Sequence, residues 1–131
     1  MDNKYLVSEA LAEAFLLQQG YEVARPVDPR RPYDLLMRAN KFCSWWAVQV
    51  KTAYQEGASK IFNACRTTPT GREHYELLDI DAFIVVDGED IYKIPIRWTY
   101  DKAYRIRVHD IPEEYKWSMN PTGSAATPAT S

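Results

Sequence analysis

The sequence predicts a single α/β domain in which helices flank a mixed β-sheet. Three patterns favour this fold class: apolar residues at helical spacing near the N-terminus, a series of short apolar runs bounded by turn residues, and a closing pair of such runs joined by a tight turn. The length of 131 residues and the hydrophobic content of 46% suit one compact core. We expect residues 1–118 to form this domain and residues 119–131 to be a disordered tail, because from residue 120 onward the chain has no large apolar side chain.

The first element is a predicted helix from Tyr5 to Gln19. Its apolar residues are spaced by four, four and three, which gives one stripe along the helix: Leu6, Ala10, Ala14 and Leu17. Gly20 is well placed to end the helix.

Three short strands are predicted to follow the helix. The first runs from Tyr21 to Ala24 and leads into a loop, residues 25–32, whose three prolines forbid regular structure. The second runs from about Tyr33 to Arg38. The third runs from about Ser44 to Thr52, where aromatic and β-branched residues favour a strand.

The middle of the chain gives a weaker pattern than its two ends. A short strand is suggested near Ile61, and the polar residues from Arg66 to Gly71 are expected to be a loop. Residues 81–87 form a predicted buried strand, and residues 91–96 are expected to pair back on it as a hairpin.

The third strand brings two polar side chains to one surface. Side chains alternate between the two faces of a strand, so Val48 and Val50 can face the core while Gln49 and Lys51 share the opposite face. Asp34 lies near the start of the preceding apolar strand, where a buried carboxylate is costly without a metal, a cation or hydrogen bonds.

Asp34, Gln49 and Lys51 together suit a site for phosphodiester hydrolysis. This reaction requires neutralisation of the phosphate charge and a nucleophilic water. A hard cation such as Mg²⁺ supplies both, and it prefers carboxylate, amide-carbonyl and water ligands. A lysine can stabilise the developing charge or orient the water. Spacing alone does not single out this site, because Asp and Lys flank strands in many proteins.

The segments around these residues also carry a family resemblance. They are the helix and its Gly-Tyr end at residues 9–23, the Tyr-Asp-Leu-Leu run at 33–36, the Gln-Val-Lys strand at 46–52, and the closing hairpin at 81–96. In this order they resemble the PD-(D/E)XK nuclease superfamily. The resemblance is closest to the group I intron-associated (homing) endonuclease branch, in which the (D/E)-x-K motif occurs as Q-x-K.

The resemblance implies a restriction-endonuclease-like fold and a metal-dependent site for cutting DNA. Carried over by position, Glu9, Asp34 and Gln49 would bind Mg²⁺ or Mn²⁺, with the carbonyl of Val50 as a further ligand, and Lys51 would assist the water. Glu13 is an alternative helix acid, since helix geometry does not exclude it.

Two departures from the family pattern concern the metal site. Tyr33 separates Pro32 from Asp34, so the literal Pro-Asp pair is absent. Gln49 is neutral, and we therefore expect weaker metal binding than a glutamate would give.

The expected partner is double-stranded DNA. A domain of this size covers little of a long target, so we expect a homodimer or homotetramer. A junction-resolving nuclease of the same fold and a non-catalytic DNA-binding module are the alternatives.

The charge pattern suits a DNA partner although the net charge is −2. Between Arg25 and Arg72 there are nine basic and three acidic residues, whereas residues 73–90 contain seven acids and no Lys or Arg. Five of the basic residues are candidate phosphate contacts: Arg30, Arg31, Lys60, Arg66 and Arg72. Solvated surface is the equally simple interpretation of each of them.

Other classes of protein find little support in the sequence. No apolar run approaches the roughly 20 residues of a membrane span, and the acidic N-terminal segment is unlike a signal peptide. Cys43 and Cys65 are expected to be reduced thiols of a cytoplasmic protein, prokaryotic or phage-encoded. His74 and His109 lack zinc-site spacing, and no GxSxG or phosphate-binding glycine loop occurs.

Overall fold

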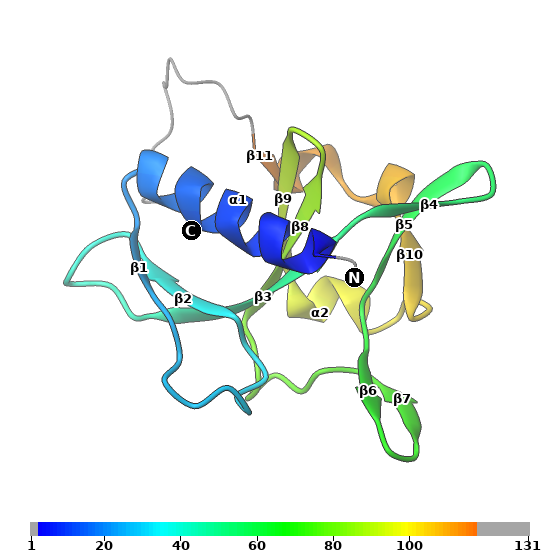
Figure 1. Ribbon diagram of the computed structural model, residues 1–131, viewed down its shortest axis with the longest axis horizontal. Helices are drawn as coiled ribbons and strands as arrows, with labels where there is room; N and C mark the ends of the chain where they lie inside the picture. The colour runs from blue at the N-terminus through cyan, green and yellow to red at the C-terminus, as the bar shows by residue number, and fades with distance from the viewer. Residues whose placement is uncertain (1–2, 118–131) are drawn as a thin grey trace.

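The computed structural model describes residues 3–117, in which a mixed six-stranded sheet is the largest element (Figure 1). The predicted tail, residues 119–131, lies outside the described residues. In spatial order the strands are β1 (Glu22–Ala24), β2 (Leu35–Arg38), β3 (Trp46–Thr52), β8 (Ala82–Asp87), β9 (Asp90–Pro95) and β11 (Lys116–Trp117). The pair β3–β8 is parallel and every other neighbouring pair is antiparallel, which confirms the predicted mixed sheet.

Two smaller sheets and a few short helices complete the described residues. One small sheet has the order β10-β5-β4, and the other is the hairpin β6–β7. Their bounds are β4 (Tyr54–Glu56), β5 (Ser59–Asn63), β6 (Arg66–Thr68), β7 (Gly71–Glu73) and β10 (Arg105–Arg107). The helices are α1 (Lys4–Gln18), α2 (Ile96–Thr99) and the 3-10 turns η1 (Val108–Asp110) and η2 (Glu113–Tyr115). None of these helices is long and apolar enough to cross a membrane.

The two faces of the central sheet pack against different hydrophobic clusters. On β8, Ile84 belongs to the cluster beneath α1, whereas Phe83 and Val85 belong to the cluster on the opposite face. Burial on both faces explains why residues 82–86 of this strand are all apolar. Helix α1 lies across one face of the sheet, as Figure 1 shows.

The predicted apolar stripe of the N-terminal helix is wrong in orientation. The helix packs through Ser8, Ala12, Phe15 and Leu16, whereas Leu6 and Leu17 are 50% and 54% exposed. Both sides of α1 are apolar, so residue spacing could not decide which side faces the sheet. The large Phe15 and Leu16 side chains fill the core, and the predicted stripe faces outward.

The predicted loop from Arg66 to Gly71 is also wrong, because most of it forms the hairpin β6–β7. The turn is closed by the Thr68 hydroxyl, which donates to the Gly71 carbonyl at 3.1 Å, and Gly71 adopts a φ of +136° that favours glycine. The polar residues of these strands are not packed on a core, so they lack the apolar alternation by which a strand is recognised. The strand suggested near Ile61 is confirmed as β5.

Candidate active site

Asp34 is fixed beside β3 by two backbone contacts. Its amide donates to the Val48 carbonyl at 2.9 Å, and its carboxylate accepts the Val50 amide at 2.9 Å. Pairing of β2 with β3 continues from this point, with Leu35 opposite Val48. The side chain of Asp34 therefore lies next to the polar face of β3.

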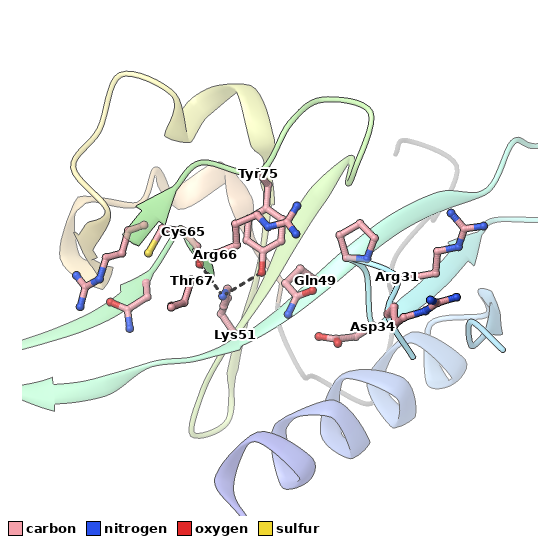
Figure 2. A pocket seen from close by; sticks show the side chains of 12 residues that line it. Arg31, Asp34, Gln49, Lys51, Cys65, Arg66, Thr67 and Tyr75 are labelled. Atoms are coloured by element: carbon pink, nitrogen blue, oxygen red, sulfur yellow. Dashed lines mark hydrogen bonds between the residues drawn. The ribbon is translucent and has the colours of Figure 1, made fainter. Parts of the chain in front are cut away.

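Gln49 and Lys51 reach that polar face because β3 alternates as predicted. Val48 and Val50 are buried in the core, and Gln49 and Lys51 line a pocket of about 410 Å³ together with Asp34. Figure 2 shows the three side chains directed into this shared space. Four arginines also line the pocket: Arg30, Arg31, Arg66 and Arg72.

The carboxyl of Asp34 is in an environment that suits a cation. Burial raises its pKa from 3.8 to about 6, and the negative charge of Glu9 acts in the same direction. The Val50 amide and the charges of Lys51 and Arg25 oppose the shift without reversing it. Within residues 3–117 the Asp34 carboxylate has no ion pair, so its charge is only partly compensated.

Lys51 is held by two groups that the sequence did not indicate. Its Nζ donates to the Cys65 carbonyl at 3.2 Å and to the Tyr75 hydroxyl at 3.4 Å, and it lies 5.2 Å from the centre of the Tyr75 ring (Figure 2). Burial lowers the pKa of Lys51 and raises that of Tyr75 to about 12. Tyr75 comes from a segment without strand or helix periodicity, so no local pattern could have identified it.

The two acids of α1 share one arginine. Arg25 lies 3.4 Å from Glu9 and also forms an ion pair with Glu13, and the hydrogen bond to Glu13 is the main cause of its raised pKa. Neither acid lines the pocket. The effect of Glu9 on the Asp34 pKa shows that Glu9 nevertheless lies within electrostatic range of the site.

The oxygen donors of this site fit a hard divalent cation only if Gln49 takes part. Within residues 3–117, no three His, Cys, Asp or Glu side chains converge to hold a metal ion. The Asp34 carboxylate and the Gln49 amide do line the same pocket, and both are donors that Mg²⁺ accepts. The partly buried and only partly compensated carboxylate of Asp34 is the observation that favours a cation here.

The five predicted DNA contacts differ in whether their side chains already have an ion-pair partner. Arg30 is paired with Asp28 at 3.1 Å, and Lys60, which does not line the pocket, is paired with Asp87 at 2.7 Å. Arg66 lies between Glu73 and Asp79. By contrast, the side chains of Arg31 and Arg72 have no hydrogen bond or ion pair within the described part of the chain.

Comparison with known proteins identifies the family and the fold. A family model described as PD-(D/E)XK endonuclease matches residues 2–122. Among solved structures, a bacterial homing endonuclease, I-Ssp6803I, is similar with a TM-score of 0.70 and 21% sequence identity over 86% of each chain. This likeness confirms the predicted restriction-endonuclease-like fold. No protein in the curated comparison matches the sequence.

Proposed function

The chain belongs to the PD-(D/E)XK endonuclease family, and we propose that it hydrolyses DNA phosphodiester bonds with Mg²⁺ or Mn²⁺ in the pocket that contains Asp34, Gln49 and Lys51. The observation that carries this proposal is the partly buried Asp34 carboxylate, which shares its pocket with an amide oxygen donor and a lysine. A buried acid of this kind is stabilised by a bound cation.

The residues that would hold the cation are Asp34 and Gln49, with the Val50 carbonyl and Glu9 as further ligands. When bound, a divalent cation neutralises charge on the phosphate and lowers the pKa of a water. Lys51 is kept beside the site by Cys65 and Tyr75, where its ammonium group can face the phosphate and orient the attacking water. Arg31 contributes an unpaired positive charge at the pocket, which supports a contact with the DNA backbone.

Within this family we propose a homing-endonuclease-like enzyme that acts on linear duplex DNA. The similar structure of a bacterial homing endonuclease and the Gln-Val-Lys form of the motif support this choice. A junction-resolving enzyme would use the same site, but it would recognise a branched shape. Cleavage of four-way junctions at least tenfold faster than of linear duplexes would contradict our choice.

The test is cleavage by wild type, Lys51→Ala and Lys60→Ala, assayed on a pool of linear duplexes and on four-way junctions with Mg²⁺, Mn²⁺ or EDTA. We expect Lys51→Ala to lower the rate by about 10²–10³-fold. Lys60→Ala separates the two expectations for Lys60, which the sequence made a candidate phosphate contact and the structure pairs with Asp87 outside the pocket. If Lys60 acts only in that ion pair, the variant should stay within about threefold of wild type.

One result would replace the enzyme by a binding module. If wild type and Lys51→Ala bind the duplexes equally well and neither cuts any DNA with either metal, the hydrolytic function is wrong. Binding would then be the function that the scaffold retains.

We further propose that the enzyme acts as a homodimer or homotetramer in which the outer face of α1 contacts a second copy. This outer face comprises exposed residues with no charge: Leu6, Val7, Ala10, Leu11, Ala14 and Leu17. A contiguous exposed apolar face of this kind is commonly covered by a protein partner. Within residues 3–117 each chain has one pocket that contains Asp34, Gln49 and Lys51, and a pair of copies would supply one such pocket for each strand of a duplex.

The pattern of side-chain sizes on this face is self-complementary. Small residues, Ala10 and Ala14, lie near its middle, and Leu6 and Leu17 lie near its ends. In an antiparallel helix pair the leucines of one copy meet those of the other, while the alanines permit close approach.

A further inference from the structure

The hairpin β6–β7, here called the ribbon, is a two-stranded sheet separate from the central sheet. It extends away from the body of the molecule in Figure 1. Its register pairs Arg66 with Glu73 and Thr67 with Arg72. Directly opposed residues of an antiparallel pair point to the same side, and neighbours along a strand point to opposite sides. The ribbon therefore has one face with Arg66 and Glu73, and another with Thr67 and Arg72.

The two faces of the ribbon differ in their charge. Arg66 is half-buried and its guanidinium lies 3.7 Å from Glu73 and 3.4 Å from Asp79. Thr67 and Arg72 are exposed, and the Arg72 side chain has no hydrogen bond or ion pair within residues 3–117. Thr67 and Arg72 line the pocket that contains Lys51, and Arg66 of the other face lines it as well, so the two faces differ in pairing and not in access to the pocket. One face is thus neutralised internally, and the other presents a free guanidinium beside the site.

Both ends of the ribbon are attached to Lys51. Cys65, which immediately precedes β6, accepts a hydrogen bond from Lys51 through its carbonyl, and so does the hydroxyl of Tyr75, two residues after β7. The backbone is fixed further because the Tyr104 hydroxyl donates to the Arg72 carbonyl at 3.2 Å. The Tyr100 hydroxyl donates to the Tyr75 carbonyl at 2.8 Å. The position of Arg72 relative to Lys51 is consequently set before any partner binds.

We propose that the ribbon enters the major groove of the DNA, and that Arg72, with Thr67 beside it, reads base edges close to the cleaved phosphate. A two-stranded ribbon fits the major groove, where arginine can donate two hydrogen bonds to guanine and threonine can contact either kind of base. Each ribbon strand has three residues, about 10 Å at the rise of a strand, which corresponds to about three base pairs. The inference rests on the proposed action on DNA and adds the element that selects the sequence.

The test is a binding selection from a pool of linear duplexes with a randomised core, carried out in EDTA at low salt so that it does not depend on cleavage. Wild type, Arg72→Ala, Arg72→Lys and Arg31→Ala are compared. Arg31→Ala is the matched control, because the Arg31 guanidinium also lines the pocket without a hydrogen bond or ion pair in the described residues, and it lies outside the ribbon. Because Arg72 is exposed and has no side-chain partner within residues 3–117, its substitution should leave thermal unfolding unchanged.

We expect wild type and Arg31→Ala to select the same sequence motif. Arg72→Ala should lose the preference for guanine at one or two adjacent positions, with discrimination there lower by about 5- to 150-fold, and the rest of the motif unchanged. Those positions should lie within one run of about three base pairs. Arg72→Lys should restore overall affinity more than it restores discrimination, because lysine acts as a point charge.

Two results would overturn the inference. Arg72→Ala could weaken binding to every sequence equally, with an unchanged motif and a salt dependence reduced by about one ion, and Arg72 would then be a phosphate contact only. A wild type that selects no motif would show that the ribbon does not recognise base sequence. A protein that selects a motif through Arg72 but cuts no DNA would contradict the proposed hydrolysis while leaving the ribbon's role intact.

Discussion

At Asp34 the chain keeps a carboxylate in a place where its charge is poorly compensated. The Val50 amide provides one hydrogen bond, and burial holds the pKa near 6. Without a bound cation, the ionised form therefore destabilises the folded protein at neutral pH. This is a cost that a bound metal would remove.

We therefore predict that Asp34→Asn stabilises the metal-free protein while it abolishes cleavage. The amide oxygen can still accept the Val50 hydrogen bond, and the buried charge is removed, so the free energy of unfolding in EDTA at pH 7.5 should rise by about 1–2 kcal/mol. Because the folded pKa lies above the unfolded value, the gain should be complete above pH 6 and should disappear as the pH falls towards 4.

Urea denaturation of wild type and variant at several pH values measures this effect. Asp28→Asn is a suitable control, because Asp28 is paired with Arg30, which lowers its pKa. The same chemical change there should give no stabilisation. An Asp34→Asn variant less stable than wild type at pH 7.5 would show that the carboxylate is already compensated.

Tyr75 contacts Lys51 through both its hydroxyl and its ring, so we predict that its role is to position the lysine. Tyr75→Phe keeps the ring beside Lys51 and removes only the hydroxyl that accepts a hydrogen bond from Nζ. We predict that kcat falls by about 5- to 20-fold while KM changes less than threefold, because the lysine is less well held during the chemical step. A fall in kcat that is explained by a loss of folded protein would contradict this role. An increase in KM with unchanged kcat would contradict it as well.

Part of the site could be predicted at the level of single residues, and part could not. The alternation of one strand is enough to place Gln49 and Lys51 together, and the position of Asp34 near the start of an apolar strand marks it as a candidate. The family resemblance adds Glu9. Arg25 and Tyr75 could not be found in this way, because their contacts join segments that are distant in the sequence and carry no motif.

At the scale of whole elements, α1 shows where periodicity stops being informative. Apolar residues occur on two opposite sides of the helix, so residue spacing alone could not decide which of the two sides packs on the sheet. Only the large side chains Phe15 and Leu16, both almost fully buried, mark the side that packs on the sheet. The acids Glu9 and Glu13 lie at the border between the two sides, where Arg25 reaches both.

This arrangement makes Arg25 a competitor of any cation that uses Glu9. We predict that Arg25→Ala tightens Mn²⁺ binding to the DNA-free protein by about two- to fivefold. The reason is that the metal-free variant lacks the partly exposed ion pair between Arg25 and Glu9, which the metal would otherwise have to break. Calorimetric titration with Mn²⁺ measures the Kd. The Kd of Arg25→Lys should lie between those of Arg25→Ala and wild type. Unchanged or weaker binding in Arg25→Ala would indicate that Glu9 does not contact the metal.

At the scale of the whole molecule, the order of helix, strands and closing hairpin could be predicted. The pairing of the third strand with the closing hairpin could not. The parallel pairing of β3 with β8 connects residues that are 34 positions apart, and the intervening segment forms the ribbon and part of a second sheet. Nothing local in the sequence records this pairing. It is nevertheless what brings Cys65 and Tyr75 over Lys51.

The same scale decides how many copies act together. If the outer face of α1 contacts a second copy, polar residues at both of its ends should separate the copies without affecting the fold. We predict that Leu6→Gln combined with Leu17→Gln raises the dissociation constant of the oligomer at least about tenfold, since both leucines are exposed in the single chain and would be buried in the pair. Glutamine is neutral, so the ion pairs of Arg25 with Glu9 and Glu13 are left alone.

Sedimentation velocity over a range of protein concentrations, with circular dichroism to verify folding, measures this change. Leu78→Gln is the matched control, because Leu78 is 96% exposed and lies far from α1 in the sequence, and it should sediment as wild type does. An oligomer that resists the double substitution would place the contact elsewhere on the surface. A wild type that remains a single chain even on DNA would rule out the homo-oligomer. The pocket that contains Asp34 would then have to cut the two strands one after the other.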